Sequence, residues 1–253
     1  MEKNRVREKA LAGEQVLGAM LGLGSPNAAE LMGYAGYDFL VIEAEHSPLD
    51  LAQIQEMLMA VGNTPAMPIV RVPSSEPMFI QRALDVGGEG LLVPMVKSAE
   101  EAAAVVSATR YPPVGTRGFG PLRASKYTFD YPGYFADAND NILIALILET
   151  REMLESLEAI ASVDGIDAIF CGLFDLCISL GLDPMAQPLQ EIEEAMERAR
   201  EICRRCGTAI GVGCSAEELR QRQDQGFRFH ICGTDYSLLG NAARAGVEVF
   251  RSL

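Results

Sequence analysis

Short runs of apolar and β-branched residues alternate with longer helical patterns along the whole chain. The runs LVIE, PIVRV, LLVP, ILIALIL and AIF are almost continuous in apolar residues, which is typical of parallel strands that are buried on both faces. This pattern predicts strands at residues 16–20, 38–42, 67–72, 90–94, 142–148, 167–171, 208–212 and 229–232.

Segments with helical periodicity lie between these predicted strands. Ser25 followed by Pro26 is typical of a helix cap and the first helical residue. The segment QEIEEAMERAREICRRC is the clearest amphipathic helix, and glycines follow most of the helical segments, as is common at helix C-termini. Helices are predicted at residues 26–35, 49–62, 76–87, 98–109, 152–162, 190–206, 216–225 and 236–250.

Eight strand–helix units in 253 residues predict an α/β fold, a (β/α)8 TIM barrel that forms one domain over residues 1–253. A doubly wound open sheet is the alternative, but it requires a glycine-rich fingerprint after its first strand, where this chain has only GLGSP. The longest connection, residues 111–141, follows the fourth predicted strand. We expect it to be a loop at the mouth of an active site, because barrel sites lie at the carboxyl ends of the strands.

The charge of the chain argues against several partners. There are 35 Asp and Glu residues against 21 Lys and Arg residues, a net charge of −14, which disfavours nucleic acid and a polybasic membrane anchor. No run reaches the roughly 18 apolar residues of a membrane span, and the charged N-terminal segment lacks the apolar core of a signal peptide. We therefore expect a cytoplasmic protein with no nucleic-acid or membrane partner and with its six cysteines reduced.

Two carboxylates follow buried strands of the predicted barrel. Glu149 comes directly after ILIALIL, and Asp175 comes shortly after AIFCG. A carboxylate at such a position has to be paired, protonated or bound to a metal ion. Two of them on neighbouring strand ends suit a hard divalent cation such as Mg²⁺ or Mn²⁺, which prefers oxygen ligands. The alternative is that each carboxylate caps the helix that follows it.

A histidine and an arginine stand at two other predicted strand ends. His46 follows the second strand, and Glu43, three residues before it, is a candidate to fix its tautomer and raise its basicity. The alternative for His46 is an ordinary surface position. Arg71 lies in PIVRVP, where a buried guanidinium needs an anion. That anion is either a fixed carboxylate or the oxygen of a bound substrate, on which Arg71 would stabilise developing charge.

Several segments together resemble the HpcH/HpaI aldolase family of metal-dependent pyruvate aldolases. They are, in chain order, GSPNAAE, EAEHSPLD, PIVRVP, LDVGGEGLLVPMV, ATRYPPVGTRGFGP, LET and GLFDL, and the resemblance covers residues 18–245. It implies a (β/α)8 barrel of the phosphoenolpyruvate/pyruvate superfamily that reversibly cleaves a 4-hydroxy-2-oxo acid to pyruvate and an aldehyde. It also implies a homo-oligomer, a hexamer built as a trimer of dimers that exchange their last helix.

The resemblance assigns roles to the residues at the strand ends. Glu149 and Asp175 match the ligands of a divalent cation, Mg²⁺ or Mn²⁺ with Co²⁺ as a further candidate. His46 matches the catalytic histidine, and Arg71 matches the arginine that faces the keto oxygen of the substrate. Lys97 is the nearest lysine to a predicted strand end and is interpreted as a surface residue, which favours metal chemistry over a Schiff base.

The chain also departs from the family pattern. Gly172 and Leu173 match the turn whose backbone amides hold the substrate carboxylate, although proline is common at the second position. Glu43 stands where the family commonly has Asp beside the histidine, Ile147 where many members have Gln, and Cys177 where Ser is common. These departures leave the substrate open.

Two alternative functions follow from what the resemblance leaves open. One is a lyase on the same fold that acts on a CoA thioester, as in citrate-lyase β-type proteins. The other is a barrel that binds a 2-oxo acid or a metal ion without turnover. For an aldehyde that carries a second acid, Arg117 and Arg123 of the long connection are candidate ligands, with a structural role in the loop as the alternative.

Overall fold

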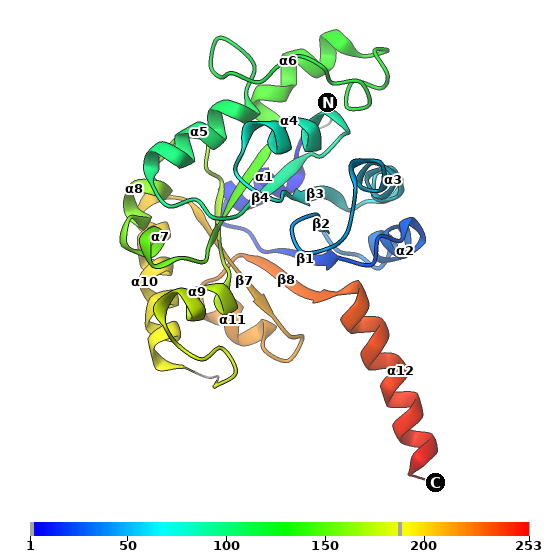
Figure 1. Cartoon of the computed structure of the whole chain (residues 1–253), viewed down its shortest axis with the longest axis vertical. Helices are drawn as coiled ribbons and strands as arrows, with labels where there is room; N and C mark the ends of the chain where they lie inside the picture. The colour runs from blue at the N-terminus through cyan, green and yellow to red at the C-terminus, as the bar shows by residue number, and fades with distance from the viewer. Residues whose placement is uncertain (1–2, 187–188, 253) are drawn as a thin grey trace.

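The computed structural model of the chain describes residues 3–186 and 189–252. Its eight parallel strands close into a barrel in sequence order, with β1 paired to β8 (Figure 1). This confirms the predicted (β/α)8 barrel, and each predicted strand overlaps an observed one. The strands are β1 (Val16–Leu21), β2 (Phe39–Glu43), β3 (Met67–Arg71), β4 (Gly90–Val93), β5 (Leu143–Leu148), β6 (Ala168–Cys171), β7 (Ala209–Cys214) and β8 (Phe229–Thr234).

Helices surround the barrel, and most follow the predicted strand–helix order. They are α1 (Arg5–Leu11), α2 (Pro26–Tyr34), α3 (Leu51–Val61), α4 (Pro77–Asp85), α5 (Ala99–Thr109), α6 (Tyr131–Asn141), α7 (Arg151–Glu155), α8 (Leu157–Ala161), α9 (Leu173–Leu180), α10 (Gln190–Cys206), α11 (Leu219–Gln225) and α12 (Asp235–Arg251).

Alternate strand residues form two apolar layers, one inside the barrel and one between the barrel and its helices. Inside, the rings of Phe39 and Phe229 stack with their centroids 4.4 Å apart. Gly18 makes room for them, since a Cβ atom there would lie 2.2 Å from the Phe39 ring. Val6 and Ala10 of α1 belong to the same inner layer, so this helix covers one end of the barrel.

The helical predictions were wrong in four places. Helix α1, which begins after the Asn4 cap, was not predicted at all. The connection expected to be a loop contains α6, which begins at Tyr131 with proline in its first turn. The helix predicted at residues 152–162 is two short helices that meet at Ser156. Helix α9 was missed because its sequence, LFDLCISL, has almost no polar face, and it ends at Gly181, which has a left-handed φ of 79°.

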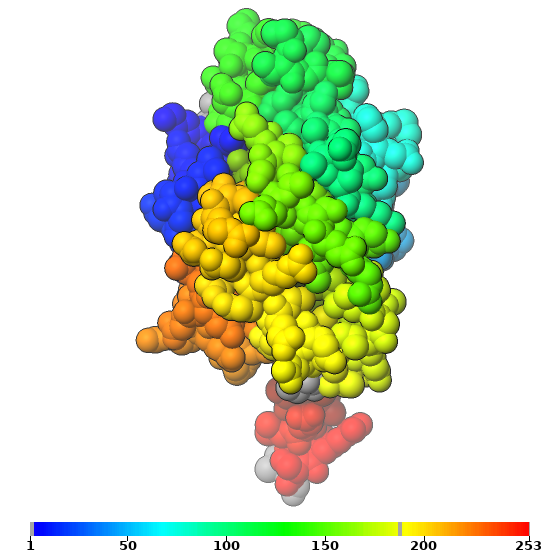
Figure 2. Space-filling view, turned by 90° about the vertical axis from the view of Figure 1, so that its left-hand side faces the viewer, coloured from blue at the N-terminus to red at the C-terminus, as the bar shows by residue number. Residues whose placement is uncertain are grey.

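Helix α12 projects away from the barrel (Figure 1), and the space-filling view shows it standing clear of the rest of the molecule (Figure 2). Asp235 at its first position is its buried residue, whereas Leu239, Val249 and Phe250 are exposed apolar side chains. No element of residues 3–186 and 189–252 covers these apolar side chains of α12. Among the described residues, none of the helices has the length and apolar character needed to cross a membrane.

Candidate active site

The residues predicted at the strand ends come together at the carboxyl end of the barrel. Glu43 at the end of β2 is the register partner of Arg71 at the end of β3. Arg71 Nη1 donates a hydrogen bond of 3.0 Å to Glu43 Oε2. The parallel register therefore creates an ion pair, and the anion that Arg71 needs is first of all a fixed carboxylate.

The structure places Glu45, and not Glu43, beside the imidazole of His46. Glu43 Oε1 instead accepts hydrogen bonds from the backbone N–H groups of Glu45, at 2.8 Å, and His46, at 3.1 Å. The Glu43 carboxylate therefore holds the turn after β2, which is a different task from the predicted contact with the imidazole. His46 Nε2 lies 3.5 Å from Glu45 Oε2 and 3.4 Å from Arg71 Nη2.

Glu45 is a site residue to which the sequence analysis gave no role. Its Oε2 atom lies 2.5 Å from Arg71 Nη2, so one carboxylate contacts both the guanidinium and the imidazole of His46. Burial raises the pKa of Glu45, the charges of Arg71 and His46 lower it, and the negative charges of Glu43 and Asp175 raise it further. The sequence feature that could have identified Glu45 is the segment EAEH, in which a second acid lies in the same turn as His46.

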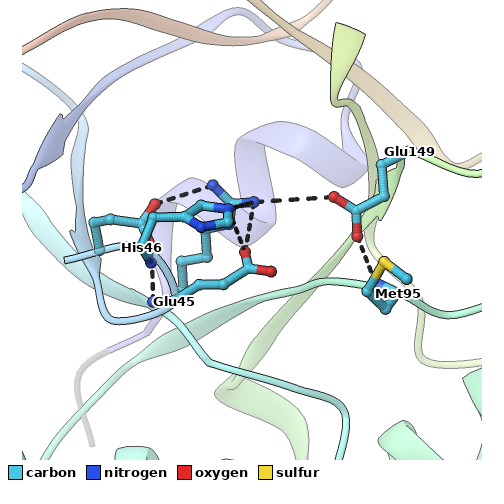
Figure 3. A network of polar contacts seen from close by, with 6 residues as sticks. Glu45, His46, Met95 and Glu149 are labelled. Atoms are coloured by element: carbon cyan, nitrogen blue, oxygen red, sulfur yellow. Dashed lines mark hydrogen bonds and ion pairs between the residues drawn. The ribbon is translucent and has the colours of Figure 1, made fainter. Parts of the chain in front are cut away.

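Glu149 lies across the mouth of the barrel from Glu45 and His46 (Figure 3). Its side chain is 3% exposed, and its Oε2 atom is 3.9 Å from Arg71 Nη2. Burial raises the pKa of Glu149 to about 7; the hydrogen bond from the Met95 N–H opposes this shift, and the negative charges of Glu45 and Asp175 add to it.

The backbone after β4 is bent toward Glu149. Met95 has a φ of 60°, in the left-handed region that residues other than glycine rarely adopt, and its N–H donates a hydrogen bond of 2.5 Å to Glu149 Oε1. Figure 3 shows this contact on the far side of Glu149 from Glu45. The strained turn therefore fixes one carboxylate oxygen and leaves the other directed into the mouth.

Asp175 lies exposed in the first turn of α9, and its negative charge raises the pKa of both Glu45 and Glu149. Gly172 caps this helix, but its N–H donates to the Leu148 carbonyl at 3.0 Å. This amide is therefore engaged between strands β5 and β6 and is not directed at a substrate. The N–H groups that the helix geometry leaves without intrahelical partners begin at Leu173.

Close packing around position 172 explains why this residue is glycine. A Cβ atom on Gly172 would lie 2.8 Å from Ile147 Cγ2 and 3.3 Å from Glu149 Cβ. The 2.8 Å contact with Ile147 is shorter than real Cβ atoms make, and the 3.3 Å contact with Glu149 is shorter than most Cβ contacts. Gly172 therefore lets the turn into α9 approach Glu149 closely.

The residues at the mouth fit a divalent cation. Four carboxylates, those of Glu43, Glu45, Glu149 and Asp175, influence one another around the single guanidinium of Arg71. In the part of the chain that the structure describes, no group of three or more His, Cys, Asp and Glu residues is arranged to hold a metal ion. Carboxylate oxygens are the donors that hard divalent cations prefer, and Mg²⁺ usually keeps several water or substrate ligands beside one or two carboxylates.

The two arginines of the long connection do not face the mouth. Arg117 Nη2 donates to Asp85 Oδ1 at 2.7 Å and to the Tyr134 hydroxyl at 3.1 Å, and its side chain is fully buried. Arg123 Nη1 donates to the Val86 carbonyl at 3.0 Å. Both guanidinium groups brace the connection against α4 and the turn after it, so the alternative, a structural role in the loop, agrees with their contacts.

Comparison with known proteins assigns this barrel to a family. The model of the HpcH/HpaI aldolase/citrate lyase family matches residues 18–242. The hydroxypyruvate/pyruvate aldolase of Roseovarius nubinhibens is 38% identical over 253 residues, which covers 98% of this chain and 97% of that protein. The 4-hydroxy-2-oxo-heptane-1,7-dioate aldolase of Salmonella newport is 39% identical over 254 residues, with 97% and 96% of the two chains covered.

A solved structure shows the same similarity in three dimensions. An HpcH/HpaI aldolase/citrate lyase family protein from Burkholderia cenocepacia J2315 superposes with a TM-score of 0.93 at 32% sequence identity. The match covers 98% of this chain and 100% of that one, so the whole barrel is shared and not only its core. With the family match over most of the sequence, this means that the chain belongs to the HpcH/HpaI aldolase/citrate lyase family.

Proposed function

We propose that this aldolase cleaves a 4-hydroxy-2-oxo acid reversibly to pyruvate and an aldehyde with a divalent cation held by Glu149 and Asp175. The observation that carries the proposal is the position of Glu149, a carboxyl group that is 3% exposed at the mouth with its Oε2 atom 3.9 Å from Arg71 Nη2. Burial raises the pKa of this group to about 7. A buried carboxylate costs stability when it ionises without a nearby cation, and this supports metal binding at Glu149. The names of the aldolase relatives support the reaction.

The donor set favours Mg²⁺ or Mn²⁺ over softer cations. Glu149 and Asp175 offer carboxylate oxygens, which are the ligands of hard divalent cations, and Co²⁺ is a further candidate. When bound, such a cation supplies Lewis-acid stabilisation for the negative charge that develops on the 2-oxo group of the substrate.

Arg71 places a fixed positive charge next to the same oxygen. Its two terminal nitrogens are held by Glu43, at 3.0 Å, and Glu45, at 2.5 Å, so the guanidinium does not have to reorganise when charge develops. A preorganised donor of this kind stabilises the transition state more strongly than a mobile one. The planar fork of arginine meets both carboxylates, which the point charge of lysine would not do.

His46 is the proposed base that accepts the proton of the C4 hydroxyl group and returns it in the direction of synthesis. Its imidazole is 63% exposed at the mouth, where a substrate can reach it. Glu45, 3.5 Å from His46 Nε2, stabilises the imidazolium that forms when the proton is accepted. Glu43 is a positioning residue in this scheme, because it holds the backbone of the turn that carries His46.

The substrate carboxylate is proposed to lie at the N-terminus of α9. The N–H groups of Leu173 and its neighbours in the first turn have no intrahelical partners and would donate to a bound anion, and the helix dipole adds to the attraction. Gly172 contributes by leaving space for this approach, since its own N–H is engaged with Leu148.

Exchange of the methyl protons of pyruvate with deuterated solvent tests the proposal without knowledge of the aldehyde. We expect exchange by the wild-type protein with Mg²⁺, Mn²⁺ or Co²⁺, followed by NMR, and its loss in Glu149→Ala. The matched control is Glu191→Ala on the exposed side of α10, which should exchange like the wild type. No exchange by the wild type with any of these cations would overturn the proposed aldolase mechanism, and exchange that survives in Glu149→Ala would overturn the ligand assignment.

The aldehyde and the assembly require separate measurements. Because one relative is named a hydroxypyruvate/pyruvate aldolase, both pyruvate and hydroxypyruvate should be tested with a panel of aldehydes. Arg117 is buried against Asp85, and the half-buried Arg123 is bound to the Val86 carbonyl, so neither is placed to bind a distal acid, and aldehydes without one are favoured. The hexamer is a prediction that light scattering of the purified protein checks, and the cytoplasmic location is a prediction that cell fractionation checks.

A further inference from the structure

Two cysteines stand side by side at the carboxyl ends of the last two strands. Cys214 ends β7, and Cys232 of β8 is its register partner. Both are free thiols, and both are partly exposed. Neither residue takes part in the proposed aldolase chemistry.

The alternation of the strands places both thiols on the outer face of the barrel. Val212, two residues before Cys214, belongs to the layer between barrel and helices, while Ile231, next to Cys232, belongs to the inner layer. Burial raises the pKa of Cys214 to about 11, and the neighbouring Cys232 adds to this shift. Tyr37, which packs against the outer layer, donates to the carbonyl of Cys232 at 3.3 Å.

The spacing of the strands decides what this pair can bind. On adjacent parallel strands, the side chains of register partners point in the same direction, so their Cβ atoms are about 4.8 Å apart. A relaxed disulfide needs Cβ atoms roughly 3.5–4.5 Å apart. A tetrahedral cation with metal–sulfur bonds of about 2.3 Å holds two sulfur atoms about 3.8 Å apart, which parallel side chains reach by a small rotation. The pair is therefore better suited to chelation than to a disulfide.

We propose that Cys214 and Cys232 form a two-thiolate site for a thiophilic divalent cation of the Zn²⁺ and Cd²⁺ class. Binding replaces the two S–H protons with two metal–sulfur bonds and releases both protons to solvent, with no change of oxidation state. The turn after β7 adds negative potential, since Glu218 raises the pKa of Cys214 and Glu217 that of Cys232. The remaining positions of the cation are open to water.

This site differs from the proposed aldolase centre in position and in donors. The aldolase centre offers carboxylate oxygens in the mouth of the barrel, whereas the cysteine pair offers sulfur on its outer face. Sulfur ligands select soft cations, and carboxylates select hard ones. A soft cation can therefore occupy the pair while a hard cation occupies Glu149 and Asp175.

Titration of the metal-free protein with Cd²⁺, in the absence of oxygen, tests the proposal. Thiolate-to-cadmium charge-transfer absorption in the ultraviolet reports sulfur ligation and is not produced by carboxylates. We expect a band that saturates at one equivalent in the wild type and is lost in Cys214→Ser and Cys232→Ser. The matched control is Cys206→Ser, which removes another partly exposed thiol and should leave the band unchanged.

A second measurement needs no variant. Cd²⁺ should protect Cys214 and Cys232 from alkylation by N-ethylmaleimide, located by peptide mass spectrometry, while the alkylation of Cys206 stays unchanged. A band of wild-type amplitude in either serine variant would overturn the proposal. Unprotected alkylation of both cysteines, or the absence of any band in the wild type, would overturn it as well.

Discussion

Replacement of Glu149 by Gln should stabilise the metal-free protein at neutral and alkaline pH while it abolishes metal binding. In the wild type, burial raises the pKa of Glu149 from its ordinary value of 4.5 to about 7. A raised carboxyl pKa contributes stability below the unfolded value, and this contribution is lost as the pH rises through the folded value. The stability of the wild type should therefore fall between pH 4.5 and about 7.

The size of this effect follows from the same shift. A rise from 4.5 to about 7 corresponds to about 3 kcal/mol, and partial screening by solvent at the open mouth reduces it to about 2 kcal/mol. Gln has nearly the shape of Glu, and its amide oxygen can still accept the hydrogen bond from Met95. Glu149→Gln should therefore be about 2 kcal/mol more stable than the wild type above pH 7 and nearly equal to it near pH 4.5.

Urea unfolding in the presence of a chelator, followed by circular dichroism, measures this difference at several pH values. Glu191→Gln is the matched control and should follow the wild type at every pH. Addition of Mg²⁺ or Mn²⁺ should then stabilise the wild type and not Glu149→Gln, by about 2.7 kcal/mol when the cation is at 100 times its Kd. A stability difference that does not change with pH, or a Glu149→Gln protein that is less stable above pH 7, would refute the reasoning.

Three further substitutions test the geometry of the site and of the barrel. Arg71→Lys should lower kcat far more than metal affinity, because lysine loses the fork that contacts two carboxylates; equal losses in kinetics and calorimetry would contradict this. Gly172→Ala should weaken metal binding, because its Cβ atom would lie 2.8 Å from Ile147 Cγ2 and displace the turn; unchanged affinity in calorimetry would count against the packing argument. Gly18→Ala should destabilise the barrel by about 1–3 kcal/mol in urea unfolding, because its Cβ atom would lie 2.2 Å from the Phe39 ring; a neutral effect would show that the ring moves freely.

The strands and their order could be predicted because they depend on local patterns. Buried parallel strands need apolar residues on both faces, and continuous apolar runs such as ILIALIL meet this requirement. Helix α9 escaped prediction for the opposite reason, since a short apolar helix has no polar face that would distinguish it from a strand or a loop. The same ambiguity hid α6 among the aromatic, glycine and proline residues of the long connection.

In the site, too, some features could be predicted from the sequence and others could not. The positions of Glu149 and Arg71 at strand ends follow from the sequence, because a charge after an apolar run has to lie at the rim of the barrel. The residues that contact Glu149 and Arg71 do not follow from the sequence, because these contacts depend on the strand register and on the path of each turn. The register of β2 and β3 pairs Arg71 with Glu43, and the turn after β2 then leaves Glu45 for His46.

The sequence by itself therefore determined the barrel and the types of residue at its rim, because apolar periodicity and strand ends are properties of short segments. The tertiary structure alone decided which carboxylate meets the imidazole, that the Gly172 amide is engaged between strands, and that Arg117 and Arg123 bind α4 and the turn after it. Each of these outcomes depends on distances between residues far apart in the chain. Such distances are set only when the barrel closes, which is also what brings Cys214 beside Cys232.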